Sequence, residues 1–157
     1  MRKQICRFIA AVSCLMLLSL VATAQRSRSS VPASEVNGTF RHSFTGIYKG
    51  SSSEIKILAL GGGKLHIAMD LIYPYTMLNG DLMANTGQLD EKFAIDGDIA
   101  VFKTTVNGTC RIQIKFVAPG TIKVVQDGVN CGFGNRVTSA GTYKRVSSAK
   151  PKFDAPK

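Results

Sequence analysis

The side chains that could carry out catalysis are few and form no recognisable set. His66 is expected on the polar face of a strand, and His42 precedes the expected domain, so neither has an evident partner for acid–base work. Asp90 and Glu91 are neighbours, and adjacent strand residues point to opposite faces of a sheet. The serines at 51–53 have no histidine at a recognisable partner position. The sequence therefore predicts that the chain is not an enzyme and uses no cofactor.

Metal and phosphate sites are also poorly supported. Asp96 and Asp98 flank a glycine, but a calcium loop needs further oxygen ligands that the neighbouring sequence does not supply. The three glycines at 61–63 are expected to join two strands, whereas a phosphate-binding loop opens a helix. A zinc site at the cysteines would need two more ligands, and neither histidine has a ligand-like spacing. We expect no metal site.

The segment 72–78 is the first candidate for binding. Pro74 is expected to interrupt the pairing of a strand and to leave Tyr73, Tyr75, Met77 and Leu78 in a connection. Loops often carry function, and tyrosine and methionine are common at protein interfaces. The alternative is that this connection folds over one mouth of the domain and completes the core.

A basic stripe is the second candidate. Lys103, Arg111, Lys115 and Lys123 fall on three successive expected strands, and would share one outer face if those strands pair as hairpins. Such a face could bind a protein or an anionic polymer, or could simply be solvated and discourage association of sheet edges. It lacks the aromatic side chains on which bases would stack, so no nucleic-acid partner is expected.

The N-terminus has the features of a cleaved signal peptide. Arg2, Lys3 and Arg7 precede an apolar run over 8–21, and the small residues of 22–24 predict cleavage between Ala24 and Gln25. A membrane anchor or a lipoprotein modified at Cys14 are the alternatives, but the apolar run is short for a bilayer span. We expect a periplasmic or secreted protein without a membrane span in the mature chain.

The excess of positive charge in the mature chain is concentrated towards its two ends. Removal of 1–24 would leave 17 basic and 10 acidic residues, of which 11 and 8 lie within 43–146. The segments 25–42 and 147–157 are rich in Ser, Ala and Pro, so we expect a flexible N-terminal segment and a disordered basic tail. The excess of positive charge indicates a general attraction to anionic surfaces.

The two cysteines that remain after cleavage are expected to form a disulfide. Cys110 and Cys131 lie in a small domain of an exported chain, where paired cysteines are the rule. The loop that they close is worth roughly 3 kcal/mol in the chain-entropy model.

Apolar residues alternate with polar ones along most of the region 43–146. The clearest alternating runs cover 54–60, 64–71, 111–116 and 121–126, and Gly, Asn, Asp and Pro separate the runs. About eight strands with short connections predict an antiparallel meander, and closure into a small barrel would remove both unpaired edges. A two-sheet sandwich is the alternative. The shared Gly-x-Tyr-Lys pattern at 46–49 and 141–144 suggests that these segments are the first and last strands, lying side by side.

The C-terminal part of the domain resembles a group of small exported bacterial β-barrel proteins. The resemblance lies in Cys131-Gly132-Phe133-Gly134 followed by Gly141-Thr142-Tyr143, with an earlier cysteine matched by Cys110. It implies a small barrel with this disulfide and assigns no site residue. The general shape is also similar, at the level of fold only, to periplasmic lysozyme inhibitors.

Together these features predict an exported, non-catalytic binding module of the cell envelope. Its partner would be a protein or an anionic envelope polymer, held by the segment 72–78 and the basic stripe. The alternative is a lipocalin-like carrier of a small apolar ligand. A domain of this size with many medium-sized inward side chains is expected to have a filled interior, which disfavours the carrier.

Overall fold

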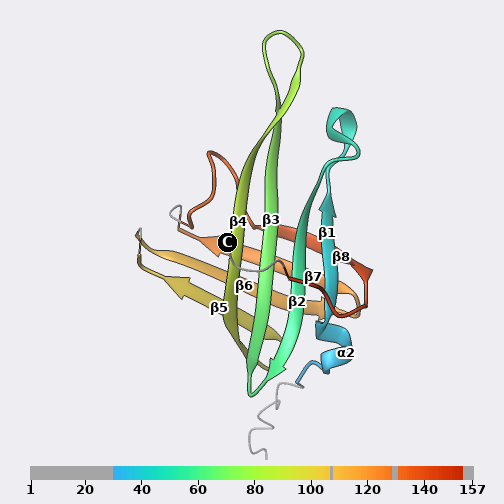
Figure 1. Cartoon of the computed structure of the whole chain (residues 1–157), viewed down its shortest axis with the longest axis vertical. Helices are drawn as coiled ribbons and strands as arrows, with labels where there is room; N and C mark the ends of the chain where they lie inside the picture. Colours follow the sequence, from blue (N-terminus) through green and yellow to red (C-terminus); the bar gives the residue numbers. More distant parts are fainter. Residues whose placement is uncertain (1–29, 107, 129–130, 154–157) are drawn as a thin grey trace, which may run out of the picture.

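Over the residues that the structure describes, the chain forms one closed antiparallel barrel of eight strands (Figure 1). The computed structural model describes residues 30–106, 108–128 and 131–153, so the signal peptide, its cleavage site and Cys14 lie outside the described residues. Each strand pairs with the next and the last pairs with the first, which confirms the predicted meander and excludes a sandwich. The strands are β1 (Gly38–Ser43), β2 (Ser52–Gly61), β3 (Lys64–Thr76), β4 (Leu82–Asp96), β5 (Ile99–Thr104), β6 (Cys110–Ala118), β7 (Thr121–Asp127) and β8 (Gly141–Ser147).

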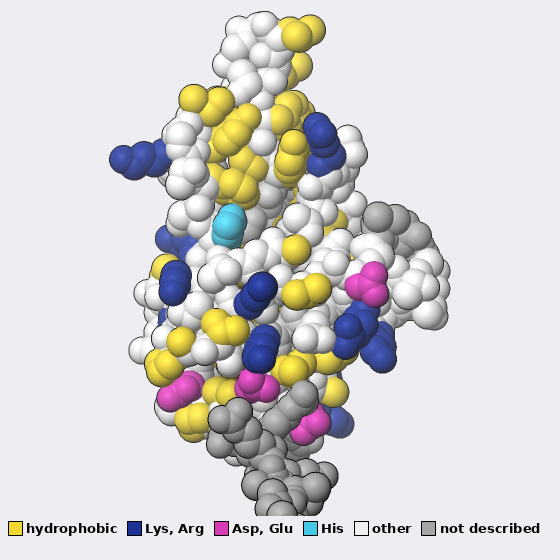
Figure 2. All heavy atoms as spheres, turned by 180° about the vertical axis from the view of Figure 1, so that it is seen from behind, with side chains coloured by type: hydrophobic (Ala, Val, Ile, Leu, Met, Phe, Trp, Pro, Cys, Tyr) yellow, Lys and Arg dark blue, Asp and Glu magenta, His cyan; other side chains and the backbone are white. Residues whose placement is uncertain are grey.

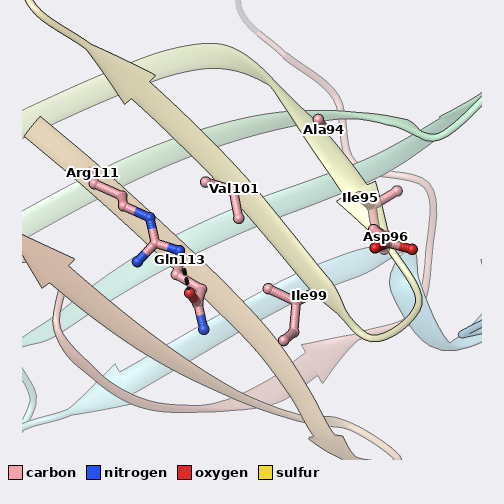
Figure 3. Close-up of a pocket in the computed structure, with 7 residues that line it drawn as sticks. All are labelled: Ala94, Ile95, Asp96, Ile99, Val101, Arg111 and Gln113. Atoms are coloured by element: carbon pink, nitrogen blue, oxygen red, sulfur yellow. Dashed lines mark hydrogen bonds between the residues drawn. The ribbon is translucent and has the colours of Figure 1, made fainter. Parts of the chain in front are cut away.

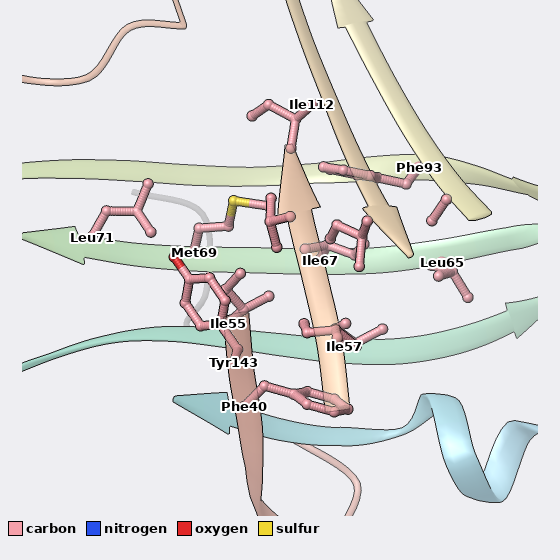
Figure 4. Packing of buried hydrophobic residues seen from close by; sticks show 14 of the residues in the cluster. Phe40, Ile55, Ile57, Leu65, Ile67, Met69, Leu71, Phe93, Ile112 and Tyr143 are labelled. Carbon is pink, nitrogen blue, oxygen red and sulfur yellow. The ribbon is translucent and has the colours of Figure 1, made fainter. Parts of the chain in front are cut away.

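Inward side chains fill the barrel. Alternate residues of each strand point inside, and isoleucine, leucine and methionine predominate among the buried side chains of β2, β3 and β6. They pack with aromatic residues of β1, β4 and β8 into a single apolar cluster (Figure 4). The largest side chains with almost no exposure are Tyr143, Phe40, Phe93, Ile55, Ile57, Leu65, Ile67, Met69, Leu71, Ile112, Ile114 and Ile122.

The barrel begins earlier in the chain than the sequence indicated. Residues 38–42, expected within a flexible segment, form most of β1, and the short helix α2 (Ala33–Val36) precedes it. Val36 and Phe40 are buried in the core. The alternation was hard to recognise because β1 carries one large inward side chain, Phe40, among small and polar residues.

The barrel closes through different residues from those predicted. β8 pairs with β1 at residues 39–41. Gly46–Tyr48 forms the short 3-10 helix η2 in the connection from β1 to β2. Gly46 has a φ of 64°, in the left-handed region, whereas a regular strand has an extended backbone with negative φ. The first and last strands are neighbours as expected, but the Gly-x-Tyr-Lys pattern at 46–49 does not mark the first strand.

Pro74 does not interrupt β3. It lies within the strand, opposite Ala84 of β4, and its side chain is buried. The pairing of β2 with β3 ends at Asp70, and the next β2-facing amide, that of Ile72, donates to the Ser53 hydroxyl oxygen at 3.0 Å. No described strand lies beyond this point on that edge, so the missing N–H of Pro74 breaks no ladder bond. The prediction that residues 72–78 form a connection is therefore wrong, except for Met77 and Leu78, which follow the end of β3.

One long connection departs from the expected short links. Residues 128–140 join β7 to β8, and the predicted disulfide between Cys110 and Cys131 ties this connection to the start of β6. Residues 131–137, called the cap segment below, lie along β4 where β5 no longer pairs with it. The amide of Gly134 donates to the carbonyl oxygen of Thr86 at 3.0 Å, and Asn85 donates to the carbonyl oxygen of Asn135 at 2.8 Å.

Part of the expected disordered tail has a defined position. Phe153 stacks on the ring of His66, with 3.8 Å between ring centroids and 15° between planes. His66 in turn pairs with Asp90 on the neighbouring strand. The tail therefore crosses the outer face of the barrel at least as far as Phe153.

Candidate binding surface

The hairpin of β3 and β4 extends well above the rest of the barrel (Figure 1). Its outer part, residues 73–85, is called the arm. Within the arm the two strands pair with each other, from Tyr73 opposite Asn85 to Thr76 opposite Leu82. β5 pairs with β4 only at residues 94–96, far below the arm. The arm is thus a two-stranded ribbon that projects from one end of the molecule.

The arm keeps the apolar alternation of the strand after it has left the core. Tyr73, Tyr75 and Met77 continue the inward-facing series of β3, and exposure rises along it from buried Leu71 to Met77, which is 47% exposed. Met83 lies opposite Tyr75 and therefore on the same face. This face would line a core if the opposite wall of the barrel were as tall.

The end of the arm is apolar and exposed. Leu78 at its apex is fully exposed at 110%, while Leu82 is 58% and Met83 48% exposed. Ile47 in the neighbouring helix η2 is 67% exposed, and the Tyr48 hydroxyl group lies 3.4 Å from that of Thr76, so η2 stands beside the arm. We call Tyr75, Met77, Leu78, Leu82, Met83 and Ile47 the apolar patch. Figure 2 shows hydrophobic side chains gathered at and below the tip.

The tip is a compact turn held by backbone and side-chain hydrogen bonds. The amide of Met77 donates to the carbonyl oxygen of Asp81, and that of Gly80 to the carbonyl oxygen of Met77, both at 2.9 Å. The side-chain amide of Asn79 donates to the Asp81 carboxylate at 2.7 Å. Gly80 has a φ of 90°, which the turn requires and few other residues would adopt. The conformation of the tip is therefore held by hydrogen bonds within the chain and needs no partner.

The cap segment supports the base of the arm. Phe133 packs against Gly87 of β4, and the Arg136 guanidinium lies 5.3 Å from the centroid of the Tyr73 ring. Tyr73 is thus engaged within the molecule and contributes little free surface. Of the predicted binding residues in this region, Tyr75, Met77 and Leu78 are at the exposed part of the arm.

Sequence reasoning missed Leu82, Met83 and Ile47. Leu82 and Met83 follow the tip turn directly, and an apolar pair after Asn79-Gly80-Asp81 was a signal for a returning strand. Ile47 had been assigned to a strand. Their common property, exposure at one end of the molecule, becomes visible only when the unequal heights of the two barrel walls are known.

The basic stripe lies together on the outer face, as predicted. Lys103 is opposite Arg111, and Lys115 is opposite Lys123, on β5, β6 and β7. Carboxylates lie within the same face: Lys115 is 3.9 Å from Asp98, and Arg111 is also opposite Asp127. The stripe is a surface of mixed charge, and its binding role remains a prediction.

A shallow groove of about 500 Å³ adjoins the stripe at the corner between β4, β5 and β6 (Figure 3). Its apolar lining includes Ile99 and Val101, and the Arg111 guanidinium donates to the Gln113 side-chain oxygen at 2.8 Å. Asp96 also lines it. The groove is open and carries both signs of charge, so it has no clear preference for an anion.

The remaining candidates for chemistry have structural partners. His66 is occupied by Asp90 and Phe153, and His42 lies 3.0 Å from the carbonyl oxygen of Thr142 through its Nδ1. Across the described ranges, no three His, Cys, Asp or Glu side chains gather in a group that could hold a metal ion. None of the helices in those ranges has the length and apolar character that crossing a bilayer requires.

Comparison with known proteins adds no assignment. No protein-family model matches the chain, and neither the curated proteins nor the solved structures include a significant match.

Proposed function

We propose that this chain is an exported, non-catalytic binding module of the cell envelope and that the arm is its contact surface. The observation that carries the proposal is the apolar patch, whose side chains protrude from an otherwise well-packed barrel. Soluble domains rarely leave such side chains together on a rigid projection unless something covers them. The disulfide supports export, because disulfides persist in oxidising compartments.

The shape of the molecule favours binding on the outside over transport inside. A carrier of a small apolar ligand would need space within the barrel, but the inward positions are occupied by side chains that contact one another. The barrel is better described as a rigid support that holds the arm and the cap segment in place.

The proposal is tested by comparing two pairs of substitutions. Leu78→Ser with Leu82→Ser removes apolar surface from the arm. Val117→Ser with Val125→Ser is the matched control, because these valines are 47% and 48% exposed on β6 and β7, away from the arm. After expression in the native host, the fraction of protein that sediments with the envelope should fall for the arm variant and stay unchanged for the control. Equal retention of both variants would refute a binding role for the arm.

A further inference from the structure

We propose that the partner of the arm is the surface of an anionic lipid bilayer, which Leu78 enters at the level between headgroups and acyl chains. This inference rests on the proposed function, because it names the partner of the same surface.

The shape of the tip suits a fluid partner. Leu78 stands at the apex of a narrow turn and is fully exposed. Met77 directly follows β3 and Leu82 begins β4, so they lie on either side of the turn. A folded protein would need a socket deep enough to surround the apex on all sides. Acyl chains and headgroups can rearrange around a projection, so burial of these side chains needs no complementary shape.

Residues suited to the membrane interface lie below the tip. Tyr75 is half-buried on the arm, and Tyr48 stands beside it on η2 with its hydroxyl group near Thr76. Tyrosine prefers the headgroup level, where its ring is in apolar surroundings and its hydroxyl group meets water. The order from apex to base is therefore aliphatic and then aromatic, as in an interfacial anchor.

Positive charge flanks the arm and argues for an anionic surface. Lys49 ends the helix η2 on one side, and Arg136 of the cap segment lies against Tyr73 on the other. Figure 2 shows Lys or Arg side chains on both sides of the hydrophobic area below the tip. Asp81 is the one acidic residue in the arm, and Asn79 donates a hydrogen bond to its carboxylate. Basic residues close to the surface of a bilayer are attracted by anionic headgroups, which strengthens binding.

The chain contains no tryptophan, so the fluorescence of a single introduced tryptophan reports the surroundings of that residue alone. The experiment uses residues 25–157, which include all eight strands and the disulfide, since the apolar run at 8–21 would bind lipid by itself. The fluorescence of Leu78→Trp should shift to the blue with vesicles of phosphatidylcholine and phosphatidylglycerol, and brominated acyl chains should quench it. Val125→Trp on the barrel wall should show neither effect. Equal shifts at both positions, or none at Leu78, would overturn the proposal.

Vesicle flotation of the tryptophan-free protein tests the same contact without a probe. Leu78→Ser with Leu82→Ser should lower the partition coefficient by roughly tenfold or more, while Val117→Ser with Val125→Ser should leave it unchanged. Lys49→Gln with Arg136→Gln should reduce binding to the mixed vesicles but not to pure phosphatidylcholine. A partition coefficient unaffected by the arm substitutions would contradict the inference.

The two proposals fail in different ways. If the arm variant loses envelope association but the unaltered protein does not float with either kind of vesicle, the arm has a protein or polymer partner and the lipid inference is wrong. If neither envelope association nor flotation depends on the arm, the proposed function is wrong as well.

Discussion

Gly87 shows how a single residue without a side chain sets the position of the cap segment. A methyl group there would lie 2.8 Å from the Cβ atom of Phe133, closer than two carbon atoms can pack. Because the nearest atom is Cβ and not the flexible end of the ring, the clash can be relieved only by a shift of the backbone. We expect Gly87→Ala to lower the free energy of unfolding by about 1–3 kcal/mol, as measured by urea denaturation.

A double-mutant cycle identifies the cause of this loss. Phe133→Gly removes both the ring and the Cβ atom that a methyl group at position 87 would meet. Gly87→Ala should therefore cost less in the Phe133→Gly background than in the unaltered protein. Equal costs in both backgrounds would show that Gly87 is needed for another reason.

Tyr143 carries a buried hydroxyl group, and ionisation of this group destabilises the folded chain. It is 1% exposed, and the hydroxyl group donates to the carbonyl oxygen of Ser139 at 3.0 Å. Burial raises the pKa of Tyr143 well above its ordinary value of 10.0. The folded chain therefore holds this proton more tightly than the unfolded chain, so this contribution to stability is intact below pH 10 and declines as the pH rises further.

Tyr143→Phe should remove that part of the alkaline decline in the free energy of unfolding. At neutral pH the variant should lose only about 1 kcal/mol, the typical net value of one hydrogen bond. Urea titrations at several pH values would measure both effects, with Tyr75→Phe as the control that keeps the decline. An identical alkaline decline in Tyr143→Phe and the unaltered protein would contradict the assignment.

At the scale of elements, the sequence was informative where alternation is strong and misleading where it is weak. β2, β3, β6 and β7 were recognised because apolar side chains recur at every second residue. β1 was missed because its inward residues are mostly small or polar. η2 was mistaken for a strand because the conformation of Gly46 cannot be inferred from its neighbours.

The error at Pro74 has a different cause. Proline excludes a residue from the hydrogen-bonded interior of a sheet but not from an edge, and whether a strand has a free edge depends on the length of its neighbour. β2 stops pairing with β3 at Asp70. The sequence thus identified a segment of the right composition for binding, but it could not show that the segment is a rigid projecting ribbon.

The disulfide joins β6 to the cap segment, which packs against the base of the arm. Cys110 begins β6 and Cys131 begins the cap segment, with 21 residues of separation. Replacing both cysteines by serine should lower the free energy of unfolding by roughly 3 kcal/mol in urea denaturation, and should increase amide exchange in the cap segment.

Reduction of the unaltered protein is the matched control for the cysteine variant. It should produce the same loss of stability and the same increase in exchange. If the double variant is as stable as the oxidised protein, the loop entropy of the disulfide is not a major contribution to this fold.

At the scale of the whole molecule, the two sides of the barrel differ in height. The hairpin of β3 and β4 rises far above the shorter strands on the opposite side (Figure 1). The alternation of side chains and the turn residues were enough to predict the closure of the barrel, its strand order and its filled interior. They could not predict the apolar patch, because the patch arises from the difference in height between two walls that are distant in sequence.

The most direct test of the account is photo-cross-linking in the intact cell. A photoreactive amino acid replaces Leu78 at the tip of the arm or Val125 on the outer face of β7, and cross-linked products are identified after irradiation. We predict abundant products at Leu78, with envelope lipid prominent among them, and few at Val125. Products that are equally abundant at both positions, or that form only at Val125, would contradict the claim that the arm is the contact surface.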